Sequence, residues 1–142
     1  MPSTRSDLGI VDGLVQLSFA VQAVLADAAA RHDLTVGQVR LLGILRDREP
    51  GTMELARHLG LDKSSVTGLI DRAERRGLVR RAPSKEDGRA VQVSSTPLGR
   101  QLSDRVGAEI GTEIAALTAG LSETNRNRLS AIATQVVRSR TS

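Results

Sequence analysis

Two short helices joined by a tight turn constrain the fold of this chain more than any other feature of its sequence. The second helix begins at Asp62, a good N-cap residue, and the apolar residues Leu61 and Val66 flank this cap as a hydrophobic staple. It ends before Gly77, because glycine adopts the left-handed C′ conformation without strain. The first helix ends at Gly60. Together the two helices predict a helix-turn-helix.

A β-hairpin is predicted immediately after this motif. Residues 78–82 and 90–94 are short and compatible with β-structure, and residues 83–89 between them are rich in turn-formers. Residues 62–100 hold nine Lys or Arg against five Asp or Glu; the chain has 20 and 16 in total, which leaves eleven of each elsewhere. All the excess positive charge therefore lies in this one segment. A localised basic surface is typical of polyanion binders, although a solvated face that aids solubility has the same composition.

Further helices are predicted on both sides of the motif. Apolar residues recur at helical spacing over residues 8–30, in a stripe wide enough to indicate burial on more than one side. A second long stripe follows residues 96–97. The expected helix caps are short polar residues: Thr35, which forms a capping box with Gln38, Thr52, Thr96, which is followed by Pro97 at N1, and Ser122. The fold class is therefore mainly α with a small β-hairpin.

Composition limits the size, location and assembly of the protein. A chain of 142 residues is one domain, and its 39% hydrophobic content is lean for a core closed by one subunit, which indicates burial between subunits. No apolar run approaches the ~18 residues that span a bilayer. The first seven residues lack the pattern of a signal peptide, so no membrane association and a cytoplasmic location are expected.

Several classes of chemistry are excluded by the residues that the chain lacks. It contains no Cys, which removes disulfides, thiolate catalysis and Cys-based zinc sites. It also has no nucleophile elbow, no H-E-x-x-H motif and no P-loop. The expectation is a protein that is not an enzyme and that uses no metal or cofactor.

The outward face of the second helix of the motif is polar and small. Hydroxyl residues near its N-terminus can contact phosphates or bases, and an arginine further along can bind guanine with two hydrogen bonds. Such a face suits the DNA major groove, while an ordinary amphipathic surface helix is the alternative. The residues of this face are Ser64, Thr67, Gly68, Asp71, Arg72 and Arg75.

The stretch "LDKSSVTGLIDRAERRGLVRRAPSKEDGRAVQVSSTPL", residues 61–98, resembles the MarR family of bacterial transcription regulators. Its most specific parts are the helix that follows Asp62 and the tripeptide Asp87-Gly88-Arg89 at the hairpin tip. The resemblance implies a winged helix-turn-helix with N- and C-terminal dimerisation helices. It implies that residues 35–95 bind DNA and that residues 1–34 and 96–142 form a homodimer. Such a dimer is expected to regulate transcription, as a repressor, from a pseudo-palindromic site in double-stranded DNA.

The resemblance also assigns some of the DNA-binding residues by position. Ser64, Ser65, Thr67 and Arg72 fall at recognition-helix positions that approach DNA. Arg89 falls at the wing arginine that reaches the minor groove, and Asp87 at the acid that orients it. Where some relatives carry a base-reading arginine this chain has Gly68, so the operator sequence cannot be taken from them. The complete set is Lys63, Ser64, Ser65, Thr67, Gly68, Arg72, Arg75, Arg80, Arg81, Lys85, Asp87 and Arg89, of which Arg80, Arg81 and Lys85 support phosphate contact.

Release by a small-molecule effector follows from the same resemblance, because many family members bind small aromatic acids between the dimer and DNA-binding parts. Phe19 is the only aromatic residue, so a planar ligand has almost no stacking partner. Arg40, His32 and His58 are the candidates to meet a carboxylate, and each also suits a surface or capping role. The alternative function is a winged-helix module that binds protein or RNA without an operator.

Overall fold

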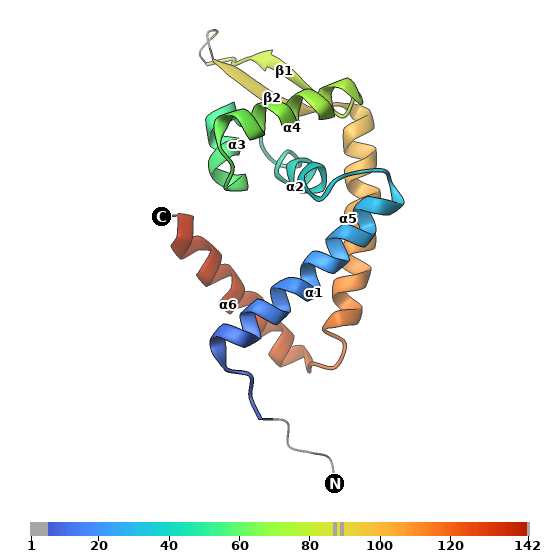
Figure 1. The fold of residues 1–142 in the computed structure, drawn as a ribbon, viewed down its shortest axis with the longest axis vertical. Helices are drawn as coiled ribbons and strands as arrows, with labels where there is room; N and C mark the ends of the chain where they lie inside the picture. The colour runs from blue at the N-terminus through green and yellow to red at the C-terminus, as the bar shows by residue number, and fades with distance from the viewer. Residues whose placement is uncertain (1–5, 87, 89, 142) are drawn as a thin grey trace. The chain divides into compact units, whose positions relative to one another are not determined.

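The computed structural model describes residues 6–86, 88 and 90–141, and it is mainly helical with one antiparallel hairpin (Figure 1). The predicted fold class is thus confirmed. The chain divides within one helix into two compact units, one that ends at Ile110 and one that begins at Gly111. The elements are α1 (Gly9–Arg31), α2 (Val36–Ile44), α3 (Thr52–Leu59), α4 (Lys63–Arg75), β1 (Val79–Pro83), β2 (Val91–Ser95), α5 (Pro97–Leu117) and α6 (Glu123–Thr141).

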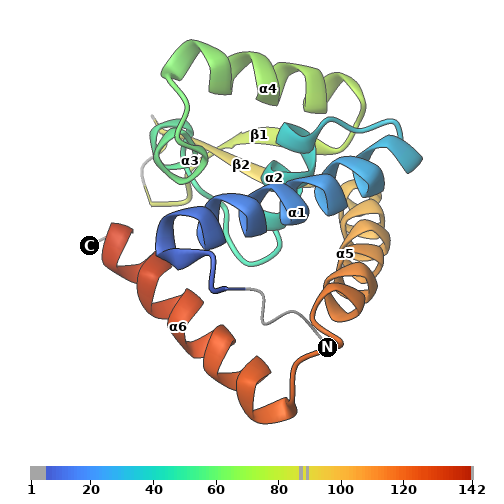
Figure 2. The same cartoon turned by 60° about the horizontal axis from the view of Figure 1, so that its bottom comes forward.

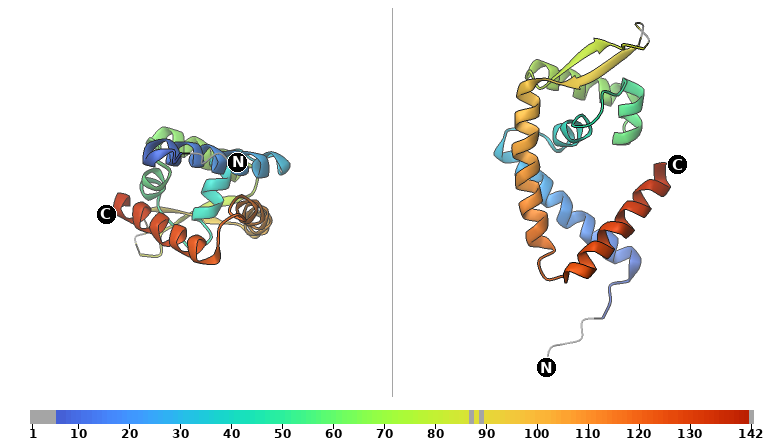
Figure 3. Two further views of the ribbon diagram at one scale, coloured as in Figure 1. Left: turned by 90° about the horizontal axis from the view of Figure 1, so that it is seen from below. Right: turned by 180° about the vertical axis from the view of Figure 1, so that it is seen from behind.

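The core of the first unit lies among α2, α3, α4 and the hairpin. In Figures 2 and 3, α4 runs along the outside of this unit, with α2 on its inner side and the hairpin beside it. The buried residues of α4 are apolar and recur at helical spacing, which is the pattern predicted from the sequence. The fully buried large side chains of the core are Leu41, Leu55, Val66, Ile70, Leu78, Val79 and Val93.

The turn of the helix-turn-helix and the end of α4 depend on two left-handed glycines, Gly60 at φ 65° and Gly77 at φ 73°. After α4, the backbone N–H of Gly77 donates to Glu74 and that of Leu78 donates to Ala73, which is the Schellman pattern. These bonds satisfy the last carbonyls of α4. The predicted glycine C′ cap of α4 is confirmed.

The N-cap of α3 and the bounds of both strands differ from the prediction, and α1 spans Gly9–Arg31 where residues 8–30 were expected. Gly51, not Thr52, is the N-cap of α3, because Gly51 is held in extended form by a β-bridge to Gln92. Each strand begins one residue later than expected, at Val79 and Val91. In β1 the backbone N–H of Leu78 donates to the carbonyl of Ala73 in the Schellman motif. Pairing with β2 therefore begins only at the next residue, Val79.

The start of α5 packs closely against the end of α4. Thr96 caps α5 as predicted, since its Oγ1 accepts the backbone N–H of Gly99 at 3.0 Å, and its own N–H donates to the Leu78 carbonyl at 3.1 Å. A Cβ atom at Gly99 would lie 2.0 Å from that same carbonyl oxygen. Only glycine therefore fits at this position.

Helix α1 is apolar but little of it is buried. Ala28 and Ala29 near its end enter the core. Among the described residues, α1 is the one helix long and apolar enough to cross a membrane by length and composition, with a mean hydropathy of 1.6. The expectation that no apolar run approaches the ~18 residues that span a bilayer is therefore wrong for α1. Its exposed large apolar residues, together with the residue that precedes it, are Leu8, Ile10, Val11, Leu14, Val15, Leu17 and Phe19.

The second unit consists of the last turns of α5, a short connection and α6. Ser122 caps α6 as predicted, because its Oγ accepts the backbone N–H of Asn125 at 3.1 Å. Along the described part of α6 no residue is buried. Its exposed apolar residues are Leu129, Ile132, Val136 and Val137.

Candidate nucleic-acid interface

Asp62 organises the first turn of α4. Its Oδ1 accepts the backbone N–H of Ser65 at 2.8 Å and the hydroxyl of Ser64 at 2.9 Å. The bond from the Ser65 N–H, followed by those from the Ser64 and Ser65 hydroxyls, holds the pKa of Asp62 below its ordinary value. The carboxylate stays ionised at neutral pH, where it also interacts favourably with the positive end of the helix dipole. The predicted N-cap is confirmed.

Helix α4 has one face in the core and the opposite face in solvent. The Thr67 hydroxyl on the outer face donates to the carbonyl of Lys63 at 2.8 Å, so it is directed along the helix. A Cβ atom at Gly68 would lie 3.2 Å from Nη1 of Arg72, which places that guanidinium over the glycine. The arginine therefore covers the space that a side chain at Gly68 would fill. The predicted residues that this face leaves exposed or half-buried are Lys63, Ser64, Ser65, Thr67, Gly68, Arg72 and Arg75.

A hollow in front of α4 also involves the beginning of α2. Thr35 and Gly37 line it together with Ser64, Ser65 and Arg72. Gly37 lies against α4, because a Cβ atom there would be 3.4 Å from Cδ1 of Leu69. The capping box of Thr35 is predictable from local sequence, whereas its position beside α4 is not, since that position depends on the packing of two helices.

Arg81 joins the hairpin to α4. Its Nη2 lies 2.6 Å from Oδ1 of Asp71, its Nη1 lies 2.9 Å from Oε1 of Glu74, and its backbone N–H donates to Glu74 at 3.3 Å. The Arg81 side chain is 27% exposed. Two carboxylates therefore neutralise a cation that the sequence assigns to phosphate contact. That assignment rests on the charge of Arg81 alone, and the sequence carries no sign that Asp71 and Glu74 are its partners.

The other predicted hairpin residues lie on more open surface. Arg80 is exposed, and its Nε donates to the Ser94 hydroxyl at 3.5 Å, a long bond that leaves most of its donors available. Lys85 is exposed beyond the end of β1. Asp87 and Arg89 lie outside the described residues. The structure thus brings the outer face of α4, Arg80 and Lys85 onto one unit, with Arg81 between the hairpin and α4.

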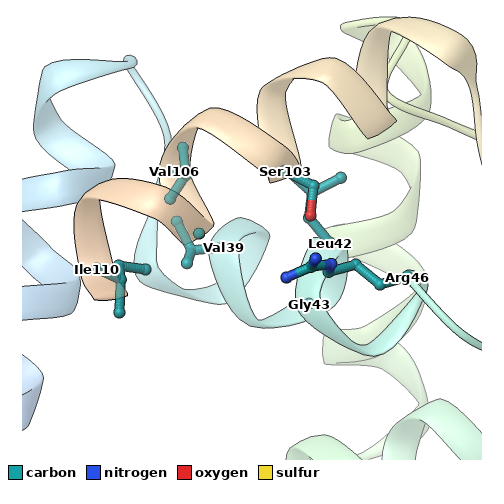
Figure 4. Close-up of a pocket in the computed structure, with 8 residues that line it drawn as sticks. Val39, Leu42, Gly43, Arg46, Ser103, Val106 and Ile110 are labelled. Atoms are coloured by element: carbon teal, nitrogen blue, oxygen red, sulfur yellow. The ribbon is translucent and has the colours of Figure 1, made fainter. Parts of the chain in front are cut away.

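A separate apolar cavity lies between α2 and α5 (Figure 4). Val39 and Leu42 of α2 face Val106 and Ile110 of α5, and Arg46 supplies the positive charge at this site. The candidates named for a carboxylate, Arg40, His32 and His58, are not part of its lining. Sequence reasoning misses Arg46 because nothing in the local sequence distinguishes it from the neighbouring exposed charges.

The two histidines have polar partners elsewhere. Nε2 of His58 lies 2.9 Å from Nη1 of Arg48 and 3.9 Å from Oε1 of Glu54. Nε2 of His32 lies 2.9 Å from Oε2 of Glu109.

Comparison with known proteins decides the family. The MarR family profile matches residues 32–90, which covers the helix-turn-helix and the first strand of the hairpin and ends just before β2. The homoprotocatechuate degradative operon repressor of Escherichia coli is 32% identical over 98 residues, which are 68% of this chain and 66% of the repressor. The chain belongs to the MarR family. The fold described above is therefore that of a MarR-family protein.

Two further relatives of this MarR-family chain extend the comparison. The HTH-type transcriptional repressor IacR of Pseudomonas putida is 39% identical over 75 residues, 52% of this chain and 45% of IacR. The chain thus spans less than half the length of that relative. CouR from Rhodococcus jostii, solved with p-coumaroyl-CoA, is 26% identical with a TM-score of 0.76, covering 87% of each chain. CouR on a 23-mer DNA duplex has a TM-score of 0.78 at 24% identity, covering 91% of this chain and 92% of CouR, which shows the shared fold.

Proposed function

We propose that this protein is a homodimeric transcriptional repressor that binds a pseudo-palindromic operator in double-stranded DNA. The observation that carries the proposal is the geometry of α4: one face is in the core, the opposite face is polar and open, and a basic hairpin is fixed beside it through Arg81. A helix held in this way can enter the major groove while the hairpin follows the adjacent backbone. In this proposal residues 35–95 bind DNA in the cytoplasm.

The DNA-contacting residues divide into two groups by chemistry. Ser64, Ser65, Thr67 and Arg72 lie on the outer face of α4 and are assigned to the major groove, with Gly68 giving close approach. The exposed cations Lys63, Arg75, Arg80 and Lys85 are assigned to phosphates. The resemblance to the family assigns Arg89 to the minor groove, with Asp87 orienting it. Arg81 is assigned to positioning the hairpin, because two carboxylates already hold it.

Dimerisation is proposed to use residues 1–34 and 96–142. The exposed apolar residues of α1 include Ile10 at 76% and Phe19 at 67% exposure, and α6 adds Val137 at 63%. A soluble monomer rarely leaves an apolar surface of this extent uncovered. A two-fold dimer presents two α4 helices, so the two half-sites should lie about one helical turn of DNA apart.

An effector is proposed to bind in the cavity of Figure 4. The cavity is apolar with one arginine at its edge, which suits a small carboxylic acid whose charge meets Arg46. Arg46 is only loosely paired with Asp104 at 4.0 Å, so its guanidinium is available. CouR, a structural relative, has been solved with p-coumaroyl-CoA. In this chain the absence of aromatic residues from the cavity lining favours an acid with an aliphatic body.

The decisive experiment is selection of bound fragments from random duplex DNA, followed by fluorescence anisotropy with the selected site at several salt concentrations. The proposal expects a two-fold symmetric motif and a logarithmic salt slope of about −0.9 for each phosphate contact. Binding to RNA or protein with no enriched duplex motif and a flat salt response would support the alternative winged-helix module instead. Release of the bound duplex by carboxylic acids, abolished by Arg46→Gln, would support the effector cavity.

A further inference from the structure

The turn that follows α1, residues 32–34, has a defined backbone structure. Its residue Asp33 is left-handed with φ 54°, a conformation that aspartate adopts more readily than most other side chains. The backbone N–H of Asp33 donates to the carbonyl of Ala30 at 3.3 Å. That of Leu34 donates to the carbonyl of Ala29 at 2.9 Å, which completes a Schellman end for α1. The direction in which α1 leaves this turn is therefore set by the turn itself.

Arg76 ties the end of α4 to this turn. It is the C-cap residue of α4. Its Nη1 donates to the carbonyl of Asp33, and its Nη2 donates to the carbonyl of His32 at 3.5 Å. Among the described residues, the hydrogen bonds of this side chain go to these two carbonyls and to no acidic group. Because a guanidinium holds its donors in a planar fork, it fixes the direction of its partner as well as the distance.

Helix α5 holds the same turn from another side. Oε2 of Glu109 contacts Nε2 of His32 at 2.9 Å and Nε of Arg31 at 3.5 Å. The hydrogen bond with His32, followed by the charges of His32 and Arg31, holds the pKa of Glu109 below its ordinary value, so the carboxylate is ionised at neutral pH. In Figures 1 and 2 the ends of α1 and α4 both lie beside α5. The three helices are thus joined at one turn.

Helix α1 acts as a lever on this turn. Its buried residues are Ala28 and Ala29 near its end, and the apolar residues toward its beginning are exposed. A helix of 23 residues is about 35 Å long, so a tilt of about 10° at the turn displaces its far end by about 6 Å. One base pair advances a DNA duplex by only about 3.4 Å. A small change at the turn is therefore large on the scale that separates one spacing of half-sites from the next.

We propose that Arg76 is a positioning residue that sets the separation of the two α4 helices in the dimer. By fixing the end of α4 to the turn, it fixes the angle between α4 and α1, whose exposed face is proposed to lie in the dimer interface. Glu109 supports the same turn through His32. Arg76 acts through the position of α4 and needs no contact with DNA. This inference rests on the proposed function, because it concerns a homodimer on an operator with two half-sites.

Fluorescence anisotropy with three duplexes tests the proposal: the selected site, and the same site with one base pair inserted or deleted at its centre. Each change shifts the half-sites by about 3.4 Å and rotates them by about 35°. The parent should bind both altered duplexes at least about tenfold more weakly, because a rigid dimer cannot engage both half-sites at once. Arg76→Ala should reduce this penalty to about threefold or less. Arg76→Lys, which keeps a cationic donor, should restore most of the penalty.

Three further variants control the comparison. Arg75→Ala is the matched control, since Arg75 precedes Arg76 on α4 and is assigned to phosphate contact. It should weaken binding to all three duplexes by the same factor and keep the spacing penalty. Asp33→Asn retains the backbone carbonyl that Arg76 uses and should also keep the penalty. Glu109→Ala releases the turn from α5 and should reduce the penalty, as Arg76→Ala does.

The outcomes separate this inference from the proposed function. A full spacing penalty in folded, dimeric Arg76→Ala would overturn the inference and leave the proposed function intact. Equal weakening of all three duplexes by Arg76→Ala would do the same, since it would make Arg76 a phosphate contact. A parent that enriches no symmetric duplex motif would overturn both. Thermal melting and sedimentation velocity report folding and dimerisation, and Arg76→Gln gives the same comparison if Arg76→Ala does not fold.

Discussion

Arg81 on β1 contacts Asp71 on α4, with 2.6 Å between Nη2 and Oδ1, and the same guanidinium reaches Glu74 at 2.9 Å. The hairpin is thereby tied to the helix at two points one turn apart. Because Asp71 and Glu74 are both acidic and adjacent on the helix surface, removal of Arg81 would leave them repelling each other. Arg81 therefore sets the position of the hairpin and also neutralises acidic charge beside the surface proposed to bind DNA.

Arg81→Ala is expected to lower the free energy of unfolding by about 1 kcal/mol, the upper range for an ion pair near the surface. It should weaken DNA binding but leave the salt slope nearly unchanged, since the Arg81 charge is already paired. The comparison variant Arg80→Ala should instead keep stability and reduce the magnitude of the slope by about 0.9 for each phosphate that is no longer neutralised. Anisotropy titrations at several salt concentrations distinguish the two. A clear fall in slope for Arg81→Ala would return that residue to phosphate contact.

The parts of the fold that depend on neighbours along the chain were predictable from the sequence. Asp62 and Gly77 indicate both ends of α4 because caps act within one helical turn. The roles of Arg81 and Arg46 were not predictable, because they depend on partners brought together by packing of separate elements. The boundary errors at Thr52 and β1 have the same origin.

Gly99→Ala is expected to destabilise the protein by at least about 2 kcal/mol, since overpacking against rigid backbone is not easily relieved. The added Cβ would lie 2.0 Å from the Leu78 carbonyl oxygen. Gly43→Ala is the control: a Cβ there has no atom within 4 Å, and alanine should stabilise α2 by about 0.5–1 kcal/mol. Urea unfolding of both variants provides the measurement. Equal effects of the two changes would contradict the close approach of α5 to Leu78.

The Asp62 cap should make stability depend on pH. Its pKa is lower in the folded chain than its ordinary value, so the folded state favours the ionised form. The stabilisation is present above the unfolded pKa of about 3.9 and is lost as the pH falls through the folded pKa. Asp62→Asn keeps a capping oxygen without the titration. The unfolding midpoints of parent and variant, measured across a range of pH, should therefore differ by an amount that changes sharply below about pH 4. A difference that stays constant with pH would argue against the cap.

Exposed residues of α1 should govern the oligomeric state. Ile10 and Phe19 are 76% and 67% exposed, so replacing both by Ser costs an isolated chain little. If they are buried between two subunits, the loss of about 1.5–3 kcal/mol per side chain should raise the dimer dissociation constant more than tenfold. Sedimentation velocity measures the change, with the exposed Gln22→Ser on the same helix as the control. An unchanged dimer, or a parent that is already monomeric, would exclude this face from the interface.

Gly68 offers a test of DNA reading that is separate from folding. Gly68 lies on the outer face of α4. A Cβ atom added there would meet only Nη1 of Arg72, at 3.2 Å, and this flexible side chain can move aside. Gly68→Ala should therefore fold and gain up to about 1 kcal/mol from helix propensity. Gly68→Arg should fold equally well and add a long donor to the face proposed to enter the major groove, where a bidentate contact with guanine discriminates by about 1–3 kcal/mol. Parallel selections from random duplex DNA should enrich guanine at one position of each half-site for the arginine variant and not for the alanine variant. Identical motifs for parent and Gly68→Arg would place this part of α4 away from the bases.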